Sequence, residues 1–265
     1  MLRGLYVAAS GMITETNRTD TIANNLANAA SSGYKRDEAV NEEFSPMLIK
    51  RINDAQDDEV TSFKGFRIEQ GPPPVGMLGL GSCTAEIATD HSQGAMTVTG
   101  NPFDLAVSGE GYFAIQTPEG VRYTRDGSFY RQANGALVTA RGQAVLNEQN
   151  RPIVLPNSAN ITIGARGQIM DGANLVDTLQ FVQFDDRRAA LKQGDNLYRP
   201  QEGAQPQAAT GEIQQGMLER SNVNVAQEMV NLIHNYRIYE AGSRALVTQD
   251  SMTDKVVNDV GRMNG

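Results

Sequence analysis

The stretch VAQEMVNLIHNYRIYEAGSRALVTQDSMTDKVVNDV, residues 225–260, places apolar and small side chains at alternating steps of four and three. This heptad spacing brings them to one face of a helix and is typical of helices that pack lengthwise against a partner. The face carries Val225, Met229, Leu232, Tyr236, Tyr239, Ser243, Leu246, Asp250, Thr253, Val257 and Val260. We expect Ser221 or Asn222 to cap the helix. At ~1.5 Å per residue, a helix of about 40 residues is roughly 60 Å long, so it needs a partner.

The N-terminal stretch has a weaker version of the same spacing. Its positions are Leu5, Ala9, Met12, Thr16, Thr19, Ala23 and Leu26. Asparagines on the other positions supply a polar side, and Ser31-Ser32-Gly33 is a natural helix stop. All ten prolines lie between Pro46 and Pro206, so both ends of the chain lack the residue most hostile to helix interiors.

Neither terminal segment can stand alone as a helix. Ordering the backbone costs roughly 1 to 2 kcal/mol per residue, and an isolated amphipathic helix buries too little to offset this cost. The missing burial comes either from pairing of the two helices with each other and with copies of the chain, or from packing on the middle domain. The spacing is compatible with both arrangements.

The middle of the chain has the pattern of strands and turns. Asp126-Gly127 and Asn134-Gly135 are strong hairpin-turn pairs, and Glu119-Gly120 is a weaker one. The β-rich runs are residues 112–117, 121–125, 136–140, 160–163 and 178–184. In the first run Phe113 and Ile115 share one face, as expected of a half-buried strand.

The predicted fold class is therefore α+β, with N- and C-terminal helices paired as a coiled-coil-like bundle and a mainly antiparallel, all-β middle domain. We predict an N-terminal helical assembly segment (1–36), an extended linker (37–74), a β-rich domain (75–216) and a C-terminal helical assembly segment (217–265). The linker ends in Gly71-Pro72-Pro73-Pro74, which is stiff and extended.

Composition excludes several classes of function. The chain has 265 residues and a formal charge of −8, which opposes nucleic acid as a partner because phosphate binding needs Lys and Arg. A single cysteine, Cys83, cannot form an internal disulfide. No apolar run is long enough to span a membrane. The first residues lack a convincing secretory signal, so we expect the protein to stay inside the cell or to leave by another route.

The sequence offers no catalytic or metal-binding pattern. His91 and His234 have no Cys or acidic residue at a metal-ligand spacing, and Gly79-Leu80-Gly81 lacks the third glycine of a dinucleotide loop. The acidic runs Asp57-Asp58-Glu59 and Asp185-Asp186 are expected to be solvated loop charges. We predict that the protein is not an enzyme and binds no metal or cofactor.

Several motifs resemble those of a known family. Ala23-Asn24-Asn25-Leu26-Ala27-Asn28, followed by Ser32-Gly33-Tyr34-Lys35-Arg36, is similar to the N-terminal signature of bacterial flagellar rod and hook proteins. The other similar motifs are Gly109-Glu110-Gly111-Tyr112-Phe113, residues 123–129 (YTRDGSF), residues 135–139 (GALVT) and Ser221-Asn222-Val223-Asn224-Val225 with Glu228-Met229-Val230, Arg237 and Tyr239-Glu240. The resemblance covers nearly the whole chain. The length of the chain fits the FlgF and FlgG class of rod proteins.

The resemblance implies a structural subunit of the flagellar basal-body rod. Such subunits are exported unfolded by the flagellar type III apparatus, without a cleaved signal peptide, and assemble with copies of themselves and with other rod and hook subunits. Their terminal helices form the inner wall of a hollow shaft that transmits torque and passes exported subunits, and the β domain forms the outer wall. The implied assembly residues are Leu5, Ala9, Met12, Ala23, Asn24, Asn25, Leu26, Asn28, Ser221, Asn222, Val223, Asn224, Val225, Met229, Leu232, Tyr236, Tyr239 and Leu246.

Alternatives remain at this point. A hook-type axial subunit would share the same motifs. A surface β-domain adhesin on a helical stalk would need a concave aromatic patch, but the chain has eight Tyr, eight Phe and no Trp. A hydrolase using Asp185 or Asp186 would need a pocket with a raised carboxylate pKa.

Overall fold

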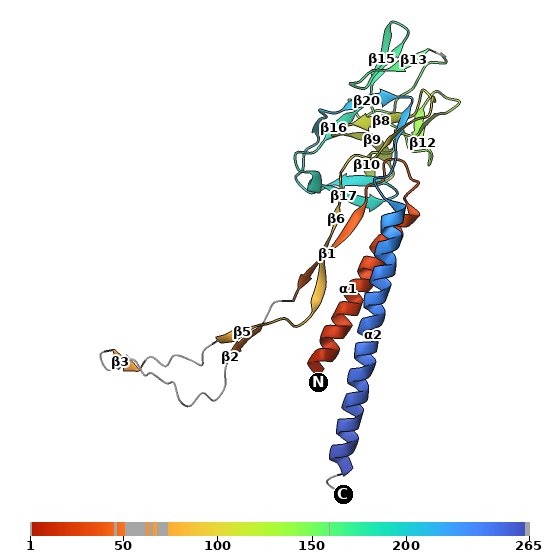
Figure 1. Cartoon of the computed structure of the whole chain (residues 1–265). Helices are drawn as coiled ribbons and strands as arrows, with labels where there is room; N and C mark the ends of the chain where they lie inside the picture. Colours follow the sequence, from red (N-terminus) through yellow and green to blue (C-terminus); the bar gives the residue numbers. More distant parts are fainter. Residues whose placement is uncertain are drawn as a thin grey trace. The chain divides into compact units, whose positions relative to one another are not determined.

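A long helix lies near each end of the chain in the computed structural model, which describes residues 2–44, 47–50, 62–63, 66–67, 74–158 and 160–262. Helix α1 spans Leu2–Ala27 and helix α2 spans Val225–Arg262, with a mostly antiparallel β middle between them (Figure 1). The predicted coarse fold is thus confirmed. The acidic run at 57–59 and residues 71–73 of the predicted connector lie outside the described residues.

The chain divides into two compact units. The helical unit comprises Met1–Thr21, Ala39–Ala88 and Val230–Gly265, and the β-rich unit comprises Ile22–Glu38 and Thr89–Met229. The last turns of α1 and the first turn of α2 therefore belong to the β-rich unit. The four predicted segment boundaries stay predictions.

In the helical unit, α1 and α2 lie side by side and antiparallel (Figure 1). The amide of Asn235 on α2 donates to the Glu15 carbonyl and to the Thr19 hydroxyl on α1. This unit also carries two-stranded pairings. They are β1 (Asp37–Glu43) with β6 (Ser82–Thr89), β2 (Met47–Lys50) with β5 (Pro74–Leu78), and β3 (Ser62–Phe63) with β4 (Phe66–Arg67).

The β-rich unit is organised around a six-stranded antiparallel sheet. Its order is β17 (Ala190–Gly194), β18 (Leu197–Pro200), β10 (Gly120–Thr124), β9 (Tyr112–Thr117), β16 (Phe181–Gln183) and β19 (Gln207–Ala208). Smaller sheets are β11 (Phe129–Arg131) with β12 (Leu137–Thr139), β8 (Leu105–Ser108) with β20 (Glu212–Gln215), β7 (Met96–Val98) with β21 (Met217–Glu219), and β13 (Ile161–Ile163), β14 (Gln168–Asp171) and β15 (Asn174–Thr178). A short 3-10 helix, η1, spans Arg187–Ala189.

Strand β9 is buried on both faces, which corrects the prediction of a half-buried strand. Phe113 and Ile115 belong to a large core with Phe129, while Tyr112 and Ala114 belong to a second core on the other face. Sequence alternation did not reveal this, because every residue from 112 to 115 is apolar or aromatic. The five predicted strands correspond to β9, β10, β12, β13 and β16, although the run 178–184 also contains the end of β15.

Two of the three predicted hairpin turns are confirmed. The turn at Glu119-Gly120 joins β9 to β10, and Asn134-Gly135 lies in the loop between β11 and β12. Asp126-Gly127 is not a hairpin turn, because β10 pairs with β9 and β18 whereas β11 pairs with β12. Asp126 instead accepts hydrogen bonds from the amide and hydroxyl of Ser128.

The predicted cap of α2 was also wrong. Asn224 accepts hydrogen bonds from the backbone N–H groups of Ala226 and Gln227, which is the role of an N-cap. Asn222 bonds elsewhere: its amide oxygen accepts from the Arg36 N–H, and its nitrogen donates to the Asp90 carbonyl.

Gly127 is a close-approach position in the β-rich unit. A Cβ atom there would lie 1.7 Å from the Leu105 carbonyl oxygen, which is fixed backbone. We expect Gly127→Ala to destabilise the β-rich unit by about 3 kcal/mol, because the backbone must shift. Gly142→Ala is the control, since Gly142 has no atom within 4 Å and a φ of 79°. It should cost about 1 kcal/mol. Equal shifts of the thermal unfolding midpoint in the two variants would contradict the prediction.

Candidate assembly site

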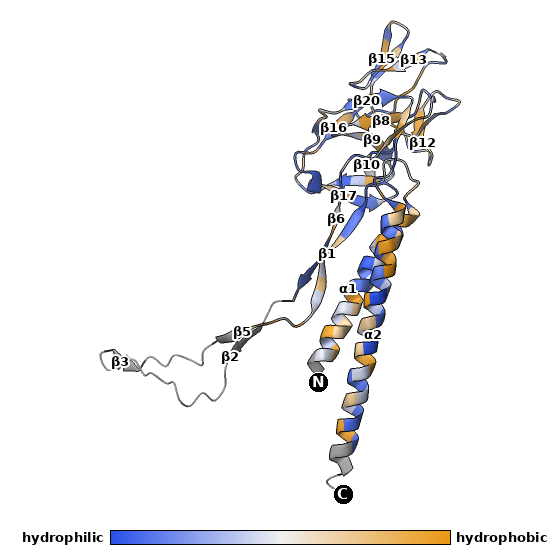
Figure 2. Cartoon of the chain, in the orientation of Figure 1, coloured by the Kyte–Doolittle hydropathy of each residue, from blue (hydrophilic) through white to orange (hydrophobic). Residues whose placement is uncertain are grey.

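Helix α2 exposes many large apolar side chains, although α1 already covers one side of it. The exposed ones are Val225, Met229, Val230, Ile233, Tyr236, Ile238, Tyr239, Val247, Met252, Val256 and Val257. Figure 2 shows apolar residues distributed along the length of α2. Monomeric soluble proteins rarely expose so much contiguous apolar surface, so this helix has the character of an interaction surface.

These side chains fall on two flanks of α2. At about 100° per residue, Ile233, Tyr236, Tyr239, Val247 and Val257 fall on one side, which we name the tyrosine flank. Val230, Ile238, Met252 and Val256 fall on the opposite side, which we name the aliphatic flank. The face that contacts α1 separates the flanks on one side, and a ridge with Arg237, Arg244 and Lys255 separates them on the other.

Helix α1 adds its own exposed apolar residues. Tyr6 and Ile13, one heptad apart, are 69% and 65% exposed, and Val7 lies beside Tyr6. The face that Tyr6 and Ile13 share is distinct from the face of α1 that carries Met12 and Thr19 toward α2. The helix pair thus presents apolar surface on both of its members.

A buried ionic cluster anchors the helix ends in the β-rich unit. The Glu219 carboxylate accepts from the Lys35 ammonium at 2.6 Å, from the Arg125 guanidinium at 3.3 Å and from the Gly94 N–H at 2.9 Å. The three charged residues are at most 5% exposed. Burial lowers the pKa of Lys35, and the Glu219 charge opposes that shift. Each charge has a partner, as buried ions require.

The Ser32-Gly33 turn fits tightly against this cluster. Gly33 has a φ of 65°, and its N–H donates to the Glu219 carbonyl. A Cβ atom on Gly33 would lie 2.5 Å from the backbone carbonyl of Arg125. The Ser32 carbonyl accepts from the amide of Asn196. Only glycine combines the left-handed conformation with this approach.

Asparagine side chains complete the anchoring. Asn25 is 1% exposed, and its side-chain amide donates to the Asp37 carbonyl and accepts from the Asp37 N–H. The side chain thus makes the two hydrogen bonds that the backbone of a paired strand would make. The Tyr34 hydroxyl also donates to Asn25. The Lys192 ammonium donates a hydrogen bond to the Lys35 carbonyl and forms an ion pair with the Asp37 carboxylate. The segment after α1 is therefore held through its own backbone.

The predicted assembly residues lie in three environments. Asn25 is buried. The half-buried ones are Leu5, Ala9, Met12, Leu26, Asn28, Ser221, Asn222, Val223, Leu232 and Leu246. The exposed ones are Ala23, Asn24, Asn224, Val225, Met229, Tyr236 and Tyr239. Asn25 and Asn222 anchor the chain within one subunit, whereas Tyr236 and Tyr239 are free to contact another. Their role in assembly stays a prediction.

Sequence reasoning missed the residues that hold the anchoring cluster. Lys35 and Arg125 lie within the family motifs, but nothing in the sequence predicts that they pair with Glu219. A Lys that directly follows Gly-Tyr at the end of a helical segment was the available signal. Asn235, at 1% exposure, was also missed because it lies one position away from the predicted apolar face.

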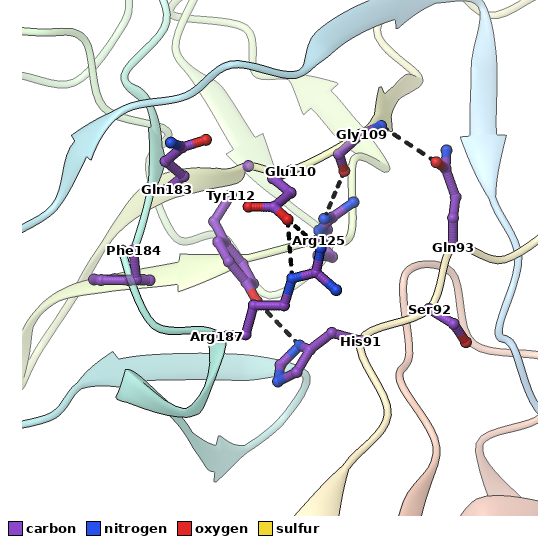
Figure 3. Close-up of a pocket in the computed structure, with 11 residues that line it drawn as sticks. His91, Ser92, Gln93, Gly109, Glu110, Tyr112, Arg125, Gln183, Phe184 and Arg187 are labelled. Atoms are coloured by element: carbon purple, nitrogen blue, oxygen red, sulfur yellow. Dashed lines mark hydrogen bonds and ion pairs between the residues drawn. The ribbon is translucent and has the colours of Figure 1, made fainter.

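A cavity of about 150 Å³ lies in the β-rich unit and is lined by residues such as His91, Tyr112 and Arg125 (Figure 3). The Tyr112 hydroxyl and His91 Nδ1 are 3.2 Å apart, and an Arg187–Glu110 ion pair also lines the cavity. Burial, followed by the charges of nearby Lys and Arg side chains, lowers the pKa of His91 to about 4. This residue is therefore neutral at physiological pH.

The acidic pair of the hydrolase alternative has structural partners. Asp186 caps η1 by accepting from the Arg188 N–H, and Asp185 accepts from the amide of Gln207. Within the described residues, no group of three or more His, Cys, Asp or Glu side chains could hold a metal ion. Among the helices that are described, none has the length and apolarity needed to cross a bilayer.

Comparisons with known proteins agree along the whole chain. Residues 5–35 match the family described as "Flagella basal body rod protein", residues 106–170 the "Flagellar hook protein FlgE/F/G D1 domain", and residues 214–259 the "Flagellar basal body rod FlgEFG protein C-terminal". The chain is 34% identical to the rod protein FlgG of Buchnera aphidicola subsp. Acyrthosiphon pisum (strain APS), over 97% of this chain and 99% of the relative. The chain belongs to the flagellar basal-body rod protein family.

Other relatives support the same membership. The rod protein FlgF of Caulobacter vibrioides is 34% identical over the full length of both chains, and FlgG of Bacillus subtilis is 33% identical over 97% of this chain and 99% of the relative. This rod protein is a structural subunit and is located in the flagellar basal body. Its family is a structural one and not a known enzyme family. Rod proteins assemble with other flagellar components.

The anchoring cluster makes a stability prediction for this rod protein. Glu219→Gln leaves the Lys35 and Arg125 charges buried without their anion, and we expect it to cost about 3 to 5 kcal/mol. Glu38→Gln breaks only the exposed pair with Arg36 and should cost less than about 1 kcal/mol. Chemical denaturation of the two variants measures the difference. Equal losses of unfolding free energy in the two variants would show that the buried ion pairs contribute no more than the exposed one.

His91 makes a pH prediction. Its pKa is about 4 in the folded chain against an ordinary value of 6.5, so between pH 6.5 and 4 only the unfolded chain takes up a proton there. Stability should fall as the pH drops through that window. His91→Gln removes this contribution, and its unfolding midpoint should fall less than that of the wild type between pH 7 and 4.5. His234→Gln, on the exposed surface of α2, is the matched control. Identical pH profiles for His91→Gln and wild type would refute the assignment.

Proposed function

We propose that this rod subunit polymerises through its terminal helices into a hollow shaft that transmits torque and passes exported subunits. The observation that carries the proposal is the pair of exposed apolar flanks on α2. One flank alone would suit a closed dimer. Two flanks facing in opposite directions suit a contact in which the tyrosine flank of one copy meets the aliphatic flank of the next.

The chemistry of the flanks supports a second copy as the partner. Both flanks present uncharged, large side chains, and burying two of them on a neighbour contributes about 3 kcal/mol. The ridge of Arg237, Arg244 and Lys255 keeps the third side of α2 polar. A contact from one flank to the other is head-to-tail, so it extends as a helical polymer when the rotation between neighbouring copies does not close a ring.

Anchoring of the helix ends supports the shaft role. The first turn of α2 and the last turns of α1 belong to the β-rich unit, where Glu219, Lys35 and Asn25 hold the neighbouring backbone. Force applied to the β-rich unit therefore reaches the end of α1 and the start of α2 through buried ion pairs and hydrogen bonds. We further propose that the protein leaves the cell through the flagellar type III apparatus, as the family resemblance implies.

The proposal predicts a complementation between two defective variants. Tyr236→Ser with Val247→Ser disables the tyrosine flank, and Ile238→Ser with Val256→Ser disables the aliphatic flank. Each double variant should need about a 100-fold higher concentration to polymerise, because about 3 kcal/mol of contact is lost. Mixed together, the two variants should form dimers, since each retains the flank that the other lacks. Light scattering and electron microscopy measure both effects.

The matched control is Arg237→Gln with Lys255→Gln, which changes the charged ridge and leaves both flanks intact. It should polymerise as the wild type does. Unimpaired polymerisation of either flank variant, with circular dichroism showing native helix content, would contradict assembly through α2. Dimers formed by each variant alone would show that like flanks pair with like.

A further inference from the structure

Three contacts between α1 and α2 recur at nearly equal spacing. Thr19 meets Asn235, Met12 meets Gly242, and Gly4 meets Gln249. The three α2 residues are seven positions apart, and the α1 residues are separated by seven and eight. The helices therefore touch in layers one heptad apart, and the two residue numbers in each layer add up to 253 or 254.

One layer is hydrogen-bonded, and in the other two a glycine makes room for the opposite side chain. Asn235 donates at 2.8 Å to the Glu15 carbonyl and at 2.7 Å to the Thr19 hydroxyl, so this layer is a buried hydrogen-bonded one. At Gly242 a Cβ atom would lie 3.1 Å from Met12 Cγ, so the missing side chain makes room for the methionine. At Gly4 a Cβ atom would lie 2.2 Å from the Gln249 amide nitrogen, so glycine again makes room.

The polar layer is not arranged for maximal stability. Within the described residues, the amide oxygen of Asn235 and one carboxylate oxygen of Glu15 are buried and accept no hydrogen bond. Apolar side chains would bury the same surface without such unsatisfied oxygens. A buried Asn between helices is a known means of fixing register at the expense of stability.

A slip of one heptad disrupts all three layers. Moving α2 in one direction sets Asn235 against Met12, whose thioether is only a weak acceptor for the amide. Moving it in the other direction sets Gln249 against Met12 and Gly242 against Thr19. The Gln249 amide then has no glycine opposite it, and the space at Gly242 is not filled by the methionine.

We infer that Asn235, with Thr19, is the residue that specifies the register of α1 against α2. It is a positioning residue: it determines which part of α1 lies level with each part of α2. The register is a property of the single chain, and its consequence for polymerisation rests on the proposed assembly through the two flanks. If the two helices slipped, the exposed residues Tyr6 and Ile13 of α1 would move by one heptad relative to the two flanks of α2.

Disulfide cross-links between introduced cysteines report the register of α1 against α2 directly. In a Cys83→Ser background, Ala8→Cys with Leu246→Cys tests the observed register, because 8 and 246 add up to 254. Ala8→Cys with Tyr239→Cys, and Ala8→Cys with Thr253→Cys, test slips of one heptad in the two directions. These pairs leave all three layers intact, and dilute, unassembled protein is used.

We expect only the Ala8–Leu246 pair to cross-link when Asn235 is present. Adding Asn235→Leu with Thr19→Val should raise the yield of at least one slipped pair about tenfold or more, while thermal stability is kept or raised. Leu232→Ala is the control, since it weakens the packing of a half-buried apolar residue and should leave the slipped pairs unlinked.

The inference is overturned if the Asn235→Leu/Thr19→Val variant keeps native helix content and still cross-links only in the observed register. If that variant loses its helix content, Asn235→Ser provides a second test: it keeps a hydroxyl donor for the Glu15 carbonyl and should hold the register. Slipped cross-links with Asn235→Ser would equally contradict the inference. Neither outcome depends on whether the flank variants polymerise, so the two proposals fail separately.

Discussion

The rest of the structure depends on the buried ion pairs that the Glu219 carboxylate forms with Lys35 and Arg125. Glu219 lies at the end of β21, six residues before α2, and it forms ion pairs with Lys35 from the segment that follows α1 and with Arg125 from the loop after β10. Three parts of the chain that are remote in sequence therefore share one buried anion. Two buried cations around one carboxylate leave little freedom for any of the three backbones, because each charge loses its partner if its segment moves. The tight fit of Gly33 against Arg125 follows from this arrangement.

Strand β9 provides the rigid support for that cluster. Because its two faces both carry apolar side chains, the strand joins two cores, and the strands on either side of it are held from both directions. The centre of the Tyr112 ring lies 5.3 Å from Arg125 Cζ and 5.1 Å from the centre of the Tyr198 ring, so the second core also contacts one of the cations of the cluster. Packing and ion pairing thus stabilise the same region, into which the chain passes where α1 ends and from which it leaves where α2 begins.

Much of this organisation could be predicted from the sequence, and the exceptions have physical reasons. The terminal helices follow from proline placement and heptad spacing, and the β middle with its two hairpin turns follows from β-rich runs separated by Glu-Gly and Asn-Gly pairs. The turn at Asp126 was misjudged because Asp-Gly also forms side-chain-capped bends. The predicted cap, Ser221 or Asn222, was wrong because Asn224 is an equally good capping residue and the sequence does not show at which of these positions the helix begins. Lys35, Arg125 and Glu219 could not be paired in advance, since nothing in their spacing shows that they meet. Asn235 escaped notice because it lies one position away from the predicted face, and a polar residue there carries no sign in the sequence that it is buried.

The two partners of the Lys35–Glu219 ion pair are separated by 184 positions in the chain. A contact of this kind cannot form until both of its residues are present, and its loop-closure entropy must be met before it contributes any free energy. In a chain that emerges N-terminus first, Lys35 cannot pair with Glu219 until another 184 of the 265 residues have followed it. The segment after α1 can form its local hydrogen bonds to Asn25 early, but its buried ion pair forms only in a late step of folding.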